Sequence, residues 1–175
     1  MRVLASIVLS LAATLSSTHL VRAETTRPAP QLEAIRSLIG NWAGKGSMMT
    51  EGKTLPVSVT WNCVESTGSA GVKCKFVMTG LPGFTYQFDD LWGFSPQDGL
   101  THWYTVTNAG EVHDHRGHFG PEGGQLETEI PVGGKMFSEV VRIKRKGKSL
   151  VISWTVTLGG TLKDKGDVTL SPRTR

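Results

Sequence analysis

The chain has 175 residues, the length of a single domain with a short leader, so we expect one hydrophobic core. Lysine and arginine total 19 against 15 aspartates and glutamates, a formal net charge of +4. So small an excess of basic residues argues against nucleic acid or an anionic membrane as the partner.

The first 23 residues have the features of a secretory signal peptide. Arg2 supplies a positive start, Val3 to Leu15 is mostly apolar, and Val21-Arg22-Ala23 precedes the expected cleavage point. The apolar run is too short, and too broken by serine and threonine, to span a membrane. The sequence therefore predicts residues 1–23 as a signal peptide and a mature protein that is periplasmic or secreted.

A polar, proline-bearing tether is predicted over residues 24–30, followed by one domain over residues 31–175. Apolar residues at helical spacing predict a short helix over residues 31–39, which ends at Gly40. A glycine-rich strand, residues 40–46, comes next. Its glycines recur at every second position, which indicates a close backbone approach or a sharp bend.

The two cysteines lie on either side of a turn, residues 66–71. With Gly68-Ser69 as the turn, Cys63 lies opposite Cys74, Trp61 opposite Phe76 and Val59 opposite Met78, all on one apolar face. An exported protein favours disulfides. We therefore expect a Cys63–Cys74 disulfide, with two buried thiols as the alternative, and no zinc ribbon or redox motif.

The remainder of the chain alternates strands with turns. Apolar residues recur at every second position over residues 84–94, where Asp90 interrupts the apolar row. Further strands are expected over residues 125–130, 136–145 and 150–158, with a last strand ending near Leu170. About ten strands joined by hairpins, after one helix, predict an all-β antiparallel barrel or sandwich.

Residues 101–119, THWYTVTNAGEVHDHRGHF, form the hairpin that carries four of the five histidines. With Ala109-Gly110 as a two-residue loop, one face carries Val106, Asn108 and our five candidate ligand-binding residues: His102, Tyr104, Glu111, His113 and His115. In this register His113 opposes Val106 and His115 opposes Tyr104. A one-residue slip would reverse the faces, and a hydrogen-bonded or solvated sheet would explain the histidines without a ligand.

The His113-x-His115 spacing puts two imidazoles on one strand face, which zinc sites use, with Glu111 or His102 available as a third ligand. A second kind of chemistry would use Asp114 to orient His118, since both lie on the other face of the hairpin. The chain contains no Gly-x-Ser-x-Gly motif for a nucleophilic serine.

The motif Gly40-x-Trp42-x-Gly44-x-Gly46 after a short helix resembles the lipocalin, calycin and nitrobindin signature. Together with LIGNWAGKGS, TWNC, MTGLPG and the histidine hairpin, it resembles a bacterial family of secreted lipocalin-like proteins of unknown function. The resemblance covers most of residues 32–170. It implies an up-and-down barrel that binds a small, often apolar molecule, with Gly40 and Trp42 in structural roles and Trp42 across the barrel floor.

The resemblance to nitrobindins raises haem as a possible cofactor. They take the histidine that binds the haem iron from the C-terminal part of the barrel, and this chain has no histidine after His118. Tyrosine can also bind haem iron, and the chain has two tyrosines, Tyr86 and Tyr104. No cofactor is therefore predicted, with haem and a divalent metal as the alternatives.

The leading functional hypothesis is an exported binding protein for a small hydrophobic or amphipathic molecule, because aromatic residues supply large apolar area and histidines could orient a ligand. One alternative is a metal-dependent or His/Asp hydrolase-like enzyme at the hairpin. The other is a structural protein whose barrel is filled by side chains. The sequence favours binding over catalysis and leaves the oligomeric state open.

Overall fold

The computed structural model describes residues 29–66 and 68–173 of the chain. The predicted signal peptide, and the tether up to residue 28, lie outside the described residues. Helix α1 (Pro30–Arg36) starts at the residue predicted to end the tether and is followed by ten strands. Among the described residues, none of the helical structure is long and apolar enough to cross a bilayer.

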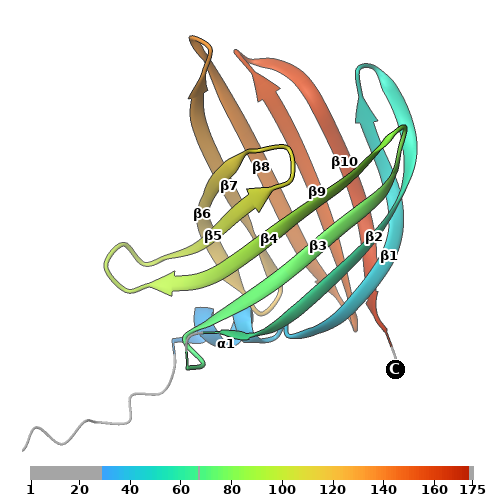
Figure 1. The fold of residues 1–175 in the computed structure, drawn as a ribbon. Helices are drawn as coiled ribbons and strands as arrows, with labels where there is room; N and C mark the ends of the chain where they lie inside the picture. Colours follow the sequence, from blue (N-terminus) through green and yellow to red (C-terminus); the bar gives the residue numbers. More distant parts are fainter. Residues whose placement is uncertain (1–28, 67, 174–175) are drawn as a thin grey trace, which may run out of the picture.

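The ten strands form one closed antiparallel barrel in which each strand pairs with its sequence neighbours and β1 pairs with β10 (Figure 1). In chain order they are β1 (Gly40–Thr50), β2 (Lys53–Ser66), β3 (Gly71–Leu81), β4 (Phe84–Ser95), β5 (Leu100–Thr107), β6 (Val112–Gly120), β7 (Gly123–Val132), β8 (Lys135–Lys146), β9 (Ser149–Leu158) and β10 (Thr161–Pro172). The predicted up-and-down barrel with a short N-terminal helix is confirmed.

Strand β1 lies close against β10 because its glycines carry no side chain there. A Cβ atom added at Gly44 or Gly46 would lie 1.8 Å from a carbonyl oxygen of β10, that of Thr169 or Asp167. The alternating glycines therefore mark a close approach of two backbones.

Helix α1 closes one end of the barrel, the lower end in Figure 1. Its buried residues Ala34 and Ile35, with Leu38 just after it, join the hydrophobic core. Trp42 is also buried, and its indole Nε1 donates a hydrogen bond of 2.8 Å to the carbonyl of Leu38. This contact ties the start of β1 to the helix.

The β2–β3 hairpin has the predicted register. Cys63 pairs with Cys74, Trp61 with Phe76 and Val59 with Met78. The Cys63–Cys74 disulfide is present, as predicted. Because apolar side chains fall on one face only in this register, the hydrophobic pattern was sufficient to select it.

The β5–β6 hairpin differs from its predicted register by one residue. Trp103 pairs with His115 and Thr105 with His113, whereas the sequence suggested Tyr104 and Val106 as their partners. The loop has three residues because the Thr107 amide donates a hydrogen bond of 2.9 Å to the carbonyl of Glu111, so that this pair closes the hairpin.

Asn108 explains the longer loop. Its side chain accepts a hydrogen bond from the Gln87 amide and donates one to the Thr85 carbonyl, both 2.9 Å long, and its own amide donates to the Gln87 carbonyl. Asn108 is therefore held by β4 and does not close the β5–β6 hairpin. This contact between distant parts of the chain could not be read from the hairpin's own sequence.

Candidate functional site

The barrel interior contains a cavity of about 220 Å³, so side chains do not fill it completely. Its walls are mostly aromatic and aliphatic, and its lining residues include Trp61, Phe76, Met78, Phe88, Trp103, Ile152 and Trp154. Met48, Leu81 and Phe137 line it near strand ends remote from α1. The cavity therefore lies toward the barrel end opposite the helix.

The register of the β5–β6 hairpin decides which candidate residues reach this cavity. Glu111 and His113 line it, and His115 is buried next to His113 on the same strand face. His102 and Tyr104 instead project to the outside of the barrel, the face that also exposes Val106 and Val112 by 55% and 65%. The five candidates thus divide between two faces.

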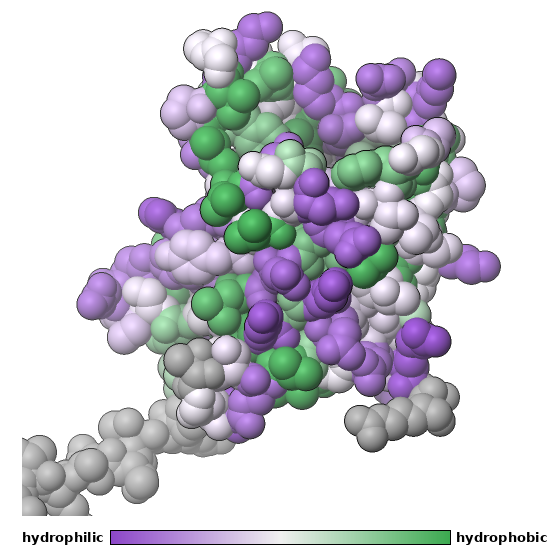
Figure 2. All heavy atoms as spheres, viewed as in Figure 1, coloured by the Kyte–Doolittle hydropathy of each residue, from purple (hydrophilic) through white to green (hydrophobic). Residues whose placement is uncertain are grey.

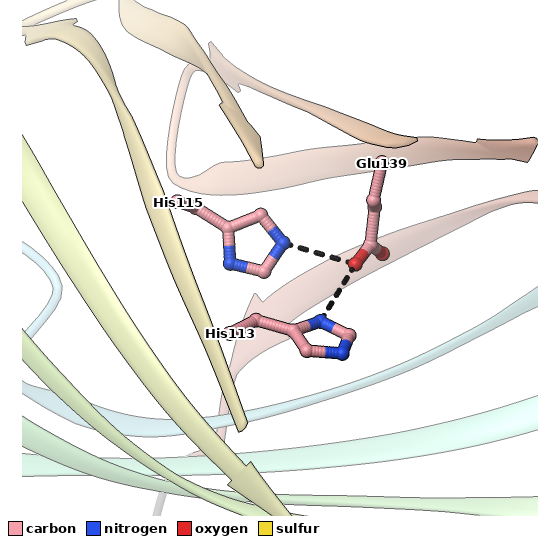
Figure 3. Close-up of side chains that lie close together, drawn as sticks. All are labelled: His113, His115 and Glu139. Atoms are coloured by element: carbon pink, nitrogen blue, oxygen red, sulfur yellow. Dashed lines mark hydrogen bonds and ion pairs between the residues drawn. The ribbon is translucent and has the colours of Figure 1, made fainter. Parts of the chain in front are cut away.

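On the inner face, both histidines converge on Glu139 of β8, which is not among the residues predicted from the sequence (Figure 3). Its carboxylate oxygen Oε2 lies 2.9 Å from His115 Nε2 and 3.3 Å from His113 Nδ1. Burial raises the pKa of Glu139, but the hydrogen bonds from His113 and His115 outweigh it and hold the pKa at about 2. The carboxylate is therefore ionised at neutral pH.

Aromatic rings hold the two imidazoles in place. His115 stacks on Trp103 with ring centroids 4.7 Å apart, and His113 packs against Phe137 at 5.1 Å. His115 Nδ1 is buried and has no hydrogen-bond partner among the described residues. The stacking, and not a second hydrogen bond, therefore fixes the orientation of this ring.

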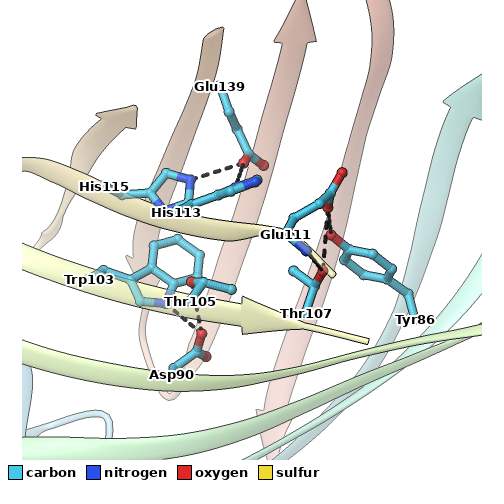
Figure 4. Close-up of polar contacts among 9 residues, drawn as sticks. All are labelled: Tyr86, Asp90, Trp103, Thr105, Thr107, Glu111, His113, His115 and Glu139. Atoms are coloured by element: carbon cyan, nitrogen blue, oxygen red, sulfur yellow. Dashed lines mark hydrogen bonds and ion pairs between the residues drawn. The ribbon is translucent and has the colours of Figure 1, made fainter. Parts of the chain in front are cut away.

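Asp90 forms a second buried polar cluster on β4 (Figure 4). Its carboxylate accepts hydrogen bonds from the indoles of Trp103 and Trp61, at 2.6 and 3.0 Å, and from the Thr105 hydroxyl at 3.1 Å. Burial raises the pKa of Asp90 to about 7 against these three donors, which lower it. Asp90 thereby positions two tryptophans of the cavity wall.

Glu111 forms the third polar group, near the hairpin loop (Figure 4). Its carboxylate accepts a 2.9 Å hydrogen bond from the Tyr86 hydroxyl and a 3.5 Å one from the Thr107 hydroxyl. Burial, followed by the neighbouring charge of Glu111, raises the pKa of Tyr86 well above its usual value. The tyrosine therefore stays a neutral donor.

On the outside, His102 lies between two carboxylates. Its Nε2 is 2.9 Å from Asp98 and its Nδ1 is 3.2 Å from Asp114, which also accepts a hydrogen bond from Arg116. Asp114 and His118 share the outer face as predicted, but among the described residues the side-chain partners of Asp114 are His102 and Arg116, not His118. Figure 2 shows hydrophilic and hydrophobic side chains interleaved over the molecule's viewed face.

The two buried carboxylates that were not predicted as site residues share one sequence feature. Glu139 interrupts an inward row of β8 otherwise formed by Phe137, Val141 and Ile143, as Asp90 interrupts the row of β4. A charged residue in an alternating apolar row indicates a buried, partnered group. The identity of the partners depends on how strands lie around the barrel.

No protein-family model and no curated protein matches the chain. Among solved structures, it is similar to Rv2717c from M. tuberculosis, with a TM-score of 0.62 and 16% identity over 83% of this chain and 99% of that one. It is also similar to the S-type phycobiliprotein lyase CPES from Guillardia theta, with a TM-score of 0.58 and 6% identity over 85% and 95% of the two chains. At these identities the likeness is one of fold: the chain has a lipocalin-like barrel.

Proposed function

We propose that the chain binds one small amphipathic molecule inside the barrel, with the apolar part of the ligand against the aromatic wall. The observation that carries this proposal is the cavity itself, which is walled by large apolar side chains and has a few polar groups at its edge. Small-molecule sites in proteins usually combine these two features.

The charge of the lining restricts the polar part of the ligand. Glu111, Glu139 and Asp164 line the cavity, and within residues 29–66 and 68–173 no lysine or arginine lines it. An anionic head group would face these carboxylates without a fixed positive partner, whereas an amine or a hydroxyl could donate hydrogen bonds to them. We therefore propose a neutral or cationic amphipath as the ligand of the metal-free protein.

Glu111 and His113 are the proposed polar contacts among the candidates of the histidine hairpin. His115 supports His113 through their shared partner Glu139. His102 and Tyr104, on the outer face, are not included in this ligand site.

A matched ligand series tests the proposal. Decylamine, decanol and decanoate share one alkyl chain and differ in head-group charge, and each is titrated against a neutral fluorescent probe, phenylnaphthylamine, bound to metal-free protein. We expect decylamine and decanol to displace the probe at concentrations at least about tenfold lower than decanoate. Equal displacement by all three, or a preference for decanoate, would contradict the proposed head-group selectivity.

Two substitutions locate the binding. Val156→Trp, on the cavity lining, should fill the space and abolish probe binding, whereas Tyr104→Ala on the outer face should leave it unchanged. Binding retained by Val156→Trp, in a variant with a normal thermal transition, would place the probe outside the cavity.

We also propose that the mature protein is exported. The Cys63–Cys74 disulfide supports this proposal, since such bonds persist mainly in oxidising compartments. Cell fractionation with an antibody against the untagged chain tests it. Recovery of the protein in the cytosol, at full length and with free thiols, would refute export.

A further inference from the structure

We infer that His113, His115 and Glu139 form a binding site for one divalent transition-metal ion of the zinc class, with a free coordination position on the cavity side. This inference goes beyond the binding of an organic molecule and stands on different observations. It concerns the three side chains that converge between β6 and β8 (Figure 3).

The ligand atoms have the spacing that a metal requires. One nitrogen of each histidine and one oxygen of Glu139 lie within 4.8 Å of one another. Zinc bonds of about 2.0–2.1 Å in a tetrahedral arrangement put ligand atoms roughly 3.3 Å apart. Since the two nitrogens are already 2.9 and 3.3 Å from the carboxylate oxygen, side-chain movements of ångström size are sufficient.

The donor set is appropriate to this class of ion. Imidazole nitrogens are borderline ligands that suit zinc and its neighbours in the first transition row, and two imidazoles with one carboxylate are a known donor set of open zinc sites. Three protein ligands also leave a fourth position for water or another molecule, as in open zinc sites. His113 and Glu139 line the cavity, so that position faces it.

The fold holds the donors in place before any ion arrives. Strand alternation puts His113 and His115 on one face of β6, where Phe137 and Trp103 pack against their rings. Glu139 comes from β8, across β7. Strand β6 pairs with β5 at both histidines but with β7 only from Arg116 onward, so β6 and β7 are not paired with each other beside the two histidines.

The local charge also favours a cation. The two ion pairs of Glu139 are with these histidines, and two more carboxylates, those of Glu111 and Asp164, line the same cavity. When the histidines are neutral, the three ligands carry one negative charge in a largely buried place. A divalent ion would offset that charge, and the resulting positive site would accept an anionic head group.

Metal binding is tested directly on untagged protein first stripped with a chelator. Competition with a chromophoric zinc chelator measures affinity and stoichiometry, and Co²⁺ supplies visible absorption bands that report an inner-sphere, tetrahedral site. We expect one ion per chain. His115→Ala and Glu139→Gln should each weaken zinc binding at least about 100-fold, since each removes or neutralises a ligand.

His102→Ala and His118→Ala are the matched controls. His102 also contacts two carboxylates, but it does so through its two different ring nitrogens. The two carboxylates therefore lie on opposite sides of the ring and cannot bind the same ion together with one of its nitrogens. Both controls should bind zinc as the natural chain does. Glu139→Gln is nearly isosteric, and its thermal transition shows whether it is folded.

The outcomes separate clearly. Stoichiometric binding that depends on His115 and Glu139 supports the site. The site would be overturned if the natural chain bound zinc no more tightly than His115→Ala and Glu139→Gln do, or if His102→Ala lost zinc binding. With zinc present, decanoate should displace phenylnaphthylamine at concentrations at least about tenfold lower than without zinc. If none of the alkyl ligands displaced the probe, the proposed ligand-binding function would be contradicted, while the zinc measurement would still stand.

Discussion

At the scale of single residues, Asp90 shows how hydrogen bonds and burial together set the protonation of a carboxyl group inside the barrel. Three donors surround its carboxylate, yet burial still raises its pKa from 3.8 to about 7. Between these two values the folded protein holds a proton that the unfolded chain has lost. The free energy of unfolding should therefore fall as pH rises from about 4 to 7, by up to about 4 kcal/mol from this group.

Asp90→Asn tests this expectation. The variant cannot titrate, so its stability should change less between pH 4 and 7 than that of the natural chain, while its overall stability falls because an amide offers fewer acceptor positions to the indoles. Urea unfolding at several pH values measures both effects. An identical pH slope in the two proteins would show that Asp90 keeps its ordinary pKa in the fold.

The sequence could reveal these residues but not their partners. Asp90 and Glu139 each stand in an inward apolar row, which marks them as unusual from the alternation alone. The indoles that serve Asp90 come from β2 and β5, and the imidazoles that serve Glu139 come from β6. Those contacts arise from the curvature and order of strands around the barrel, which local patterns do not specify.

At the scale of strands, the β1–β10 contact that closes the barrel depends on missing side chains. A Cβ at position 46 would lie 1.8 Å from the Asp167 carbonyl oxygen and 2.7 Å from the Val168 Cα. Gly46→Ala should therefore destabilise the protein by at least about 2 kcal/mol, because backbone on both strands must move.

Gly93→Ala is the control for that substitution. Gly93 lies in β4, has no heavy atom within 4 Å of an added Cβ, and does not have a positive φ angle. Its replacement by alanine should change the free energy of unfolding by less than about 0.5 kcal/mol. Equal effects of the two substitutions in urea titrations would contradict the close-contact explanation.

The disulfide gives a second prediction for this scale. Cys63 and Cys74 close a short hairpin loop, and reducing their bond should lower the free energy of unfolding by about 2–3 kcal/mol through the entropy of the unfolded chain. Thermal unfolding with and without dithiothreitol measures the change. The Cys63→Ala, Cys74→Ala double variant should show no response to the reductant; a natural chain that is equally unresponsive would contradict the prediction.

The two hairpins also show when register can be read from sequence. In β2–β3 one face is apolar and the other polar, so a slip would bury charges and only one register agrees with the pattern. In β5–β6 both faces mix polar and aromatic residues, so the pattern does not choose. The register there is fixed by Asn108, through hydrogen bonds to β4.

At the scale of the whole molecule, the regular spacing of turns was sufficient to predict an antiparallel barrel with one helix, because each hairpin contains its own pairing information. The cavity was not predictable in the same way. Its volume depends on which inward side chains meet across the barrel, and its polar edge combines residues of β4, the β5–β6 loop, β6, β8 and β10. The proposed binding function depends on that hollow being accessible to a ligand.

A crystal structure of the metal-free protein with bromodecylamine tests this most directly, because anomalous scattering locates the bromine independently of the protein density. We predict a bromine peak inside the barrel, against the aromatic wall around Trp61 and Phe76, with the amine within hydrogen-bonding distance of Glu111 or Glu139. A peak found only on the outer face, or an interior closed by side-chain rearrangement under saturating ligand, would contradict the account.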